Sequence, residues 1–143
     1  MLGSGPRQFG SMPLTTSVTV EVSPGELIDK ITILEIKLER MTDPAKLGNV
    51  RIEWRTLTAA RDAAIPPSAK LDSLTAGLKS VNERLWVIED DIRDCERAKD
   101  FGAKFVELAR AVYISNDERA RLKREINELL GSRLIEEKSY AAY

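Results

Sequence analysis

The sequence predicts an all-α fold, an antiparallel bundle of four to five helices with a minor pair of strands formed by the N- and C-terminal segments. Apolar residues recur at spacings of three and four along most of the chain after residue 17. Capping side chains followed by proline mark two helix starts. Short turns between the helical segments favour antiparallel neighbours. A chain of 143 residues suffices for one core, so we expect residues 18–143 to form a single helical domain.

The N-terminal segment is rich in glycine, serine and proline, so we expect residues 1–17 to be disordered. Two interpretations stay open for residues 1–11: a natural segment, or an expression tag with Met12 as the natural start. Val18, Val20 and Val22 then alternate with polar residues, which predicts a short strand.

The first helix is predicted from Pro24 to Met41. Ser23 and Glu26 form a capping box, in which each side chain satisfies a free backbone N–H at the helix start. At about 100° per residue, one apolar stripe consists of Leu27, Ile31, Leu34, Leu38 and Met41.

The same helix is apolar on a second side, where Ile33 and Ile36 lie near Asp29. A helix that is apolar on two sides is buried on two sides, either in its own bundle or against a partner chain. Glu35 lies at the edge of the main stripe, where a carboxylate needs a partner.

The second helix begins at Pro44, with Asp43 as its cap, and is expected to run to about Ala64. Its inward residues are Leu47, Val50, Trp54 and Leu57. The Pro66-Pro67 pair ends it, and Ser68 can cap the next helix.

The third helix, to about Lys99, has the clearest pattern, because its apolar residues keep the spacing of a coiled coil over four heptads. These residues are Leu71, Leu74, Leu78, Val81, Leu85, Ile88, Ile92 and Cys95. We expect Cys95 to be an inert core residue. Trp86 and Val87 lie outside the seam, either as interface anchors or packed under another helix of the chain.

Residues 102–131 are helical in pattern, but a second capping box at Ser115–Glu118 leaves open whether they form one helix or two. Gly131 provides a C-terminal stop. The partly apolar segment 133–140 is expected to pair as a strand with residues 18–22.

Composition restricts the function. With 22 basic and 23 acidic residues, the net charge of −1 argues against a nucleic-acid partner bound by bulk charge. We expect no membrane span, no secretory signal and, from the single cysteine, a cytoplasmic location. The chain has no histidine, so catalysis would depend on carboxylates, lysine, arginine, tyrosine or a hard metal such as magnesium.

One candidate metal site is the acidic run 89–94, in which Asp90, Asp91 and Asp94 form a DDxxD pattern. Such spacing brings carboxylates to one side of a helix, as binding a magnesium–diphosphate requires. The chain lacks a matching second motif, and a solvated acidic face is the favoured interpretation. Echoes of helical nucleotide pyrophosphatases and chorismate mutases also lack the required spacing.

A second candidate is a polar network. Asn116, Lys123 and Asn127 lie on one stripe of the last helical region. If that stripe faces the bundle, these groups need buried partners, and Glu35 is an available one. A structural network and a ligand pocket are both open interpretations.

The segment SPGELIDKITILEIKLERMTDPAKL, at 23–47, resembles a family of small bacterial and phage proteins of unknown function. Similar stretches lie at 85–93, 105–117, 123–127 and 137–140. The resemblance implies no activity, so no functional residue follows from it.

The leading hypothesis is therefore a non-enzymatic helical binding or assembly module that self-associates. Its expected interface is Ile33, Ile36, Trp86 and Val87, its expected partner is a second copy or another protein, and it needs no cofactor. The alternative is a magnesium-dependent enzyme or binder of a phosphorylated small molecule, using Lys123 with carboxylates drawn from Glu35, Glu89, Asp90, Asp91 and Asp94.

Overall fold

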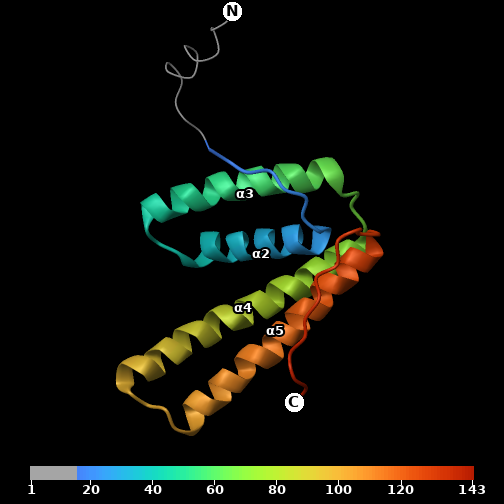
Figure 1. Ribbon diagram of the computed structural model, residues 1–143. Helices are drawn as coiled ribbons and strands as arrows, with labels where there is room; N and C mark the ends of the chain where they lie inside the picture. Colours follow the sequence, from blue (N-terminus) through green and yellow to red (C-terminus); the bar gives the residue numbers. More distant parts are fainter. Residues whose placement is uncertain (1–15) are drawn as a thin grey trace, which may run out of the picture.

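The computed structural model of the chain describes residues 16–143 and contains four helices in that part (Figure 1). They are α2 (Pro24–Arg40), α3 (Pro44–Ala64), α4 (Ala69–Ala98) and α5 (Ala103–Leu129). The all-α prediction is confirmed. The proposals for residues 1–11 lie outside the described residues. None of the four helices is both long and apolar enough to cross a membrane.

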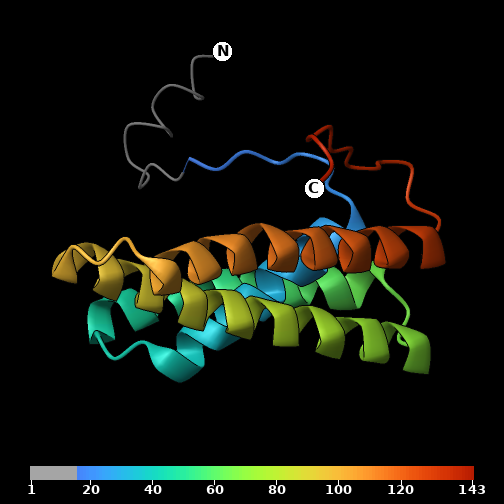
Figure 2. The same cartoon turned by 90° about the horizontal axis from the view of Figure 1, so that it is seen from below.

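The helices form two hairpins, α2–α3 and α4–α5, and are stacked in the order α3, then α2, then α4 beside α5 (Figures 1 and 2). Helix α2 is central, since it contacts α3 on one side and both α4 and α5 on the other. Helix α3 contacts only α2 among these helices. The fold is thus organised around the shortest of its helices.

Helix α2 begins at Pro24 as predicted, and the Ser23 half of the capping box forms, with the hydroxyl accepting a hydrogen bond from Glu26 N at 3.2 Å. The Glu26 carboxylate lies 3.6 Å from Lys123 Nζ. The two apolar sides of α2 are both covered by the chain itself. The side toward α4 and α5 carries Gly25, Ile28, Asp29, Thr32 and Ile36, and the side toward α3 carries Leu27, Ile31 and Leu34.

The main apolar core lies where α2 crosses the α4–α5 hairpin. It joins one residue of α2 to four of α4 and two of α5: Ile28, Leu71, Leu74, Leu78, Val81, Leu122 and Ile126. Each is less than one-tenth exposed. Burial of such side chains contributes about 1.5–3 kcal/mol apiece, so this crossing fixes the position of α2.

Helix α4 is capped by Ser68, whose hydroxyl accepts from Leu71 N at 3.1 Å, and it ends at Ala98, where the next residue, Lys99, has φ 55°. Helix α5 is continuous from Ala103 to Leu129, which answers the question left open at residues 102–131. Ser115 does not start a new helix because it occupies a seam position in phase with Leu122 and is buried.

The predicted strand pair is wrong. No strand exists in the part of the chain from residue 16 onward, and no backbone hydrogen bond joins 18–22 to 133–140. Val18 and Val20 are 82% and 66% exposed. An Arg133–Glu21 ion pair connects the two segments through their side chains. A strand is stable only when its backbone pairs with another strand. The alternation of valines with polar residues was therefore not enough to predict one.

Candidate functional site

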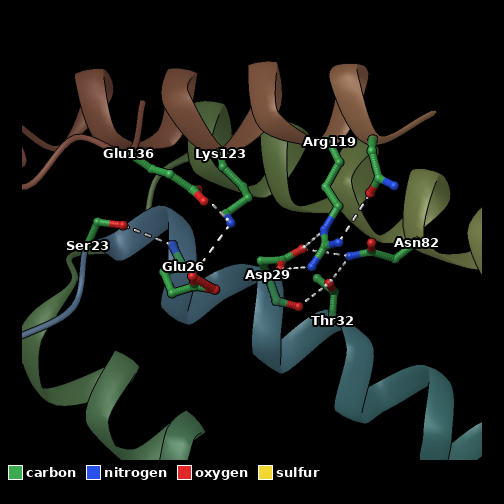
Figure 3. Close-up of polar contacts among 9 residues, drawn as sticks. Ser23, Glu26, Asp29, Thr32, Asn82, Arg119, Lys123 and Glu136 are labelled. Carbon is green, nitrogen blue, oxygen red and sulfur yellow. Dashed lines mark hydrogen bonds and ion pairs between the residues drawn. The ribbon is translucent and has the colours of Figure 1, made fainter. Parts of the chain in front are cut away.

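An ion pair between a fully buried carboxylate and a half-buried guanidinium lies at the crossing of α2 and α5. The Asp29 side chain is fully buried, and its two oxygens accept from Arg119 Nε at 2.9 Å and Nη2 at 2.6 Å (Figure 3). These hydrogen bonds raise the pKa of the Arg119 guanidinium further above its ordinary value. This two-point contact is the strongest geometry available to an arginine and a carboxylate.

Helix α4 completes the cluster through Asn82. Its amide nitrogen donates to Asp29 Oδ1 at 2.9 Å and to Thr32 Oγ1 at 3.0 Å. The Thr32 hydroxyl in turn donates to the backbone carbonyl of Asp29 at 2.8 Å. Every buried side-chain polar atom within the described part has a partner. The cluster therefore joins three helices through satisfied polar contacts, which is the arrangement that fixes a unique packing.

A second polar cluster lies one turn toward the start of α2. The backbone N–H of Gly25 donates to Asn127 Oδ1 of α5 at 2.7 Å. Lys123 is only 8% exposed, and its Nζ lies 3.0 Å from Glu136 and 3.6 Å from Glu26. Gly25 allows this approach because it has no Cβ to meet α5.

The C-terminal tail, defined here as residues 133–143, lies along α5. Three consecutive tail residues make ion pairs with that helix: Glu136 with Lys123, Glu137 with Arg124 at 3.4 Å, and Lys138 with Asp117 at 3.0 Å. Tyr143 packs on Tyr113 with ring centroids 5.0 Å apart. The tail and α5 enclose two open hollows of about 610 and 760 Å³.

The docking of the tail on α5 should depend on pH. The hydrogen bond from the Tyr143 hydroxyl, and then that from Lys138, lower the pKa of Asp117 from 3.8. The same bond to Asp117 raises the pKa of Tyr143 from 10.0. The carboxylate's contribution is present above its ordinary pKa and lost as the pH falls through the lowered value. The phenol's is present below 10.0 and lost as the pH rises through the raised value.

We therefore expect the absorbance titration of the three tyrosines to contain a late component that belongs to Tyr143. Tyr143→Phe should remove that component, and Asp117→Asn should move it to lower pH. A titration curve in which neither variant changes the late component would show that the Tyr143–Asp117 bond does not form in solution.

The residues of the predicted polar network occupy three places. Lys123 and Asn127 lie together at the start of α2, and Asn116 accepts from Arg119 Nη1 at 3.4 Å. Glu35 does not join them. It accepts a hydrogen bond from Trp54 Nε1 of α3 at 3.3 Å. Ten residues of helix, about 15 Å, separate Glu35 from the part of α2 that meets Lys123.

The predicted interface residues also differ in their surroundings. Ile36 is 1% exposed and lies inside the chain's own packing, so it cannot contact a partner. Ile33 and Trp86 are half-buried, and Val87 is 44% exposed. The second apolar side of α2 is thus covered by α4 and α5 rather than left for another molecule.

The acidic run does not form a metal centre in the structure. No group of three or more acidic or cysteine side chains that could hold a metal ion exists in the described range. Asp94 pairs with Arg97, and Asp90 and Asp91 lie on the part of α4 that α2 does not cover. Because Lys123 lies under the tail and Glu35 faces α3, the residues of the magnesium-dependent alternative do not share one site.

Sequence reasoning missed the Asp29–Arg119 pair, together with Thr32 and Asn82. One signal was available, because Asp29 lies on the second apolar side of α2, beside Ile36. A carboxylate among apolar residues indicates a buried partner. Nothing in the spacing indicated which cation would supply it.

The model of a protein family described as a family of unknown function, DUF6165, matches residues 18–143 of the chain. No curated protein and no solved structure matches it.

Proposed function

This chain belongs to the DUF6165 family of unknown function, and we propose that it is a non-enzymatic assembly module that self-associates through the free half of its α4–α5 hairpin. One observation carries the proposal. The face of this hairpin that α2 covers continues beyond α2, with no helix of the described chain against it, and it stays apolar at Trp86 of α4 and along α5. Figure 1 shows the two hairpins diverging toward the yellow and orange end.

Helical spacing identifies the residues of this face. Helix α2 contacts the hairpin at Asn82 and Arg119. Trp86 is four residues beyond Asn82, and Val112 is seven residues before Arg119. Both residues therefore lie on the same face of the hairpin as Asn82 and Arg119, but nearer to the turn between α4 and α5. We call this uncovered continuation the arm face: Trp86, Phe105, Ala109 and Val112, with Val106 and Tyr113 at its edge.

The arm face is incompletely buried for residues of this size. Trp86, Phe105 and Val112 are half-buried, whereas Val106 and Tyr113 are 53% and 41% exposed. Two antiparallel helices alone cannot enclose a seam that in a bundle is covered by further helices. Tryptophan and other aromatic residues are the side chains that most often dominate an interface.

The partner we propose is a second copy of the chain. Glu89 and Arg93 form an ion pair on α4 beside Trp86. Across a twofold axis, Glu89 of one copy can meet Arg93 of the other, and the reverse contact forms at the same time. A pair of opposite charges four residues apart is therefore complementary to itself.

Light scattering coupled to size exclusion tests this at micromolar concentration. The wild-type chain should elute with twice the mass of one chain. Trp86→Glu should shift the equilibrium to single chains by at least about thirtyfold, as expected when a central aromatic anchor is lost. Val106→Glu should weaken association less, since that residue lies at the edge.

Ile52→Glu is the matched control. Ile52 is an exposed aliphatic residue on the outer side of α3, 64% exposed, and lies outside the arm face. The control should associate as the wild type does. A wild-type chain that remains single at every concentration, or equal effects of Val106→Glu and Ile52→Glu, would rule out the arm face.

A further inference from the structure

Lys123 is a buried cation on the wall of an open groove. The residue is 8% exposed and lines both hollows that flank the C-terminal tail. The tail itself forms much of the lining of both hollows, so the wall that stays when the tail moves away is the part of α5 around Lys123. A lysine is rarely buried to this extent unless its charge has a partner, so the partner's identity is informative.

The partner is a carboxylate that the chain brings in from outside the bundle. Glu136 of the tail lies 3.0 Å from Lys123 Nζ, yet its own side chain is 60% exposed. The other carboxylate, Glu26, is farther away at 3.6 Å. The Lys123 ammonium is thus closer to Glu136, the more exposed of its two carboxylate partners, than to Glu26.

The tail is held weakly. No backbone hydrogen bond joins residues 135–143 to the helices in the described chain, and the segment has no secondary structure. Ion pairs between side chains and the contact of Tyr143 with Tyr113 hold it, and the pairs of Glu137 and Lys138 are between substantially exposed groups. Exposed pairs of this kind contribute little and are screened by salt.

The α5 side of the first hollow favours anions. It carries Arg121, Lys123 and Arg124 beside Asp117. Arg121 and Arg124 also pair with Glu125 and Glu128 of α5, whereas the carboxylates nearest Lys123 come from the tail and from α2. Asn127 lines the same hollow, and because its Oδ1 already accepts from Gly25, its amide nitrogen remains as a donor. A buried ammonium, a guanidinium and an amide together suit an oxyanion.

We infer that this groove is a binding site for a small oxyanionic ligand, a carboxylate or a phosphate, whose anionic group replaces the Glu136 carboxylate on Lys123. The tail then acts as an internal competitor that leaves when the ligand binds. Tail release and ligand binding are linked, since both groups use the same Nζ atom. This inference is independent of self-association through the arm face.

Calorimetric titration with inorganic phosphate and with succinate, at constant ionic strength set by chloride, tests it and separates the two ligand chemistries. Glu136→Gln should bind about two- to fivefold more tightly than wild type, because it removes a competing ion pair. Lys123→Met should lose binding of both anions, and a cooperative thermal unfolding transition checks that this variant is folded. Glu96→Gln, which breaks an exposed pair with Lys99 on α4, is the matched control and should bind as the wild type does.

Limited trypsin digestion gives a second readout. Saturating phosphate or succinate should speed cleavage after Arg133 and Lys138, since the tail is released, and chloride at the same ionic strength should not. Either anion supports the site. Binding of neither anion to Glu136→Gln, equal binding by Lys123→Met, or binding only of a peptide with the sequence of residues 136–143, would overturn it.

Discussion

Replacing Arg119 by methionine should lower the free energy of unfolding by about 3–5 kcal/mol, the usual cost of removing one partner of a buried ion pair. The loss is large because Asp29 is fully buried and cannot turn toward water. After the substitution its carboxylate retains only the hydrogen bond from Asn82. Urea unfolding followed by circular dichroism would show the loss as a lower midpoint at an unchanged slope.

Arg121→Met is the control on the same helix. Arg121 is exposed and pairs with Glu125, also on α5, so its removal should change stability by no more than about 0.5 kcal/mol. Similar small effects of the two substitutions would mean that Asp29 is hydrated in solution. The position of α2 on α5 would then depend on apolar contacts alone.

Gly25→Ala should destabilise the protein by about 1–3 kcal/mol, the typical cost of forcing extra volume into a packed site. An added Cβ would stand 2.8 Å from Asn127 Oδ1 and closer still to the backbone carbonyl of Lys123. The side chain of Asn127 can turn away, but the carbonyl belongs to α5. Helix α2 must therefore move outward and lengthen the Gly25–Asn127 hydrogen bond.

Gly48→Ala should have the opposite sign. Gly48 lies in α3, with open space around the position of a Cβ, so alanine there gains helix propensity of up to about 1 kcal/mol. Thermal and urea unfolding of the two variants, measured side by side, check the difference. A stabilising Gly25→Ala would show that α2 and α5 lie farther apart than the structure places them.

Local signals predicted the helices well, because caps and periodicity belong to single segments. Ser23, Asp43 and Ser68 all cap the helices that they were expected to start. The strand pair was wrong, and the number of helices over residues 102–131 stayed open, because both depend on distant segments. Alternating valines form a strand only beside a partner, and Ser115 would start a helix only if the preceding seam were out of phase.

Predicting the candidate site required knowledge of how the helices cross, which the sequence does not contain. Lys123 and Asn127 lie on a stripe that the sequence displays, but their partners come from Glu136 and Gly25. Which turn of α2 meets which turn of α5 depends on the angle at which the helices cross. Glu35 was therefore assigned the wrong partner, and Asp29 none.

The dependence of α3 on α2 has a consequence for how the molecule opens. Since α3 touches no other helix of the described chain, it can detach while the Asp29–Arg119 pair and the α4–α5 seam stay intact. Detachment of α2, in contrast, separates α3 from the α4–α5 hairpin, because α2 is the helix that contacts both. Among the four helices, the lowest-energy fluctuation is thus a partial unfolding confined to α3, and global unfolding begins only when α2 leaves.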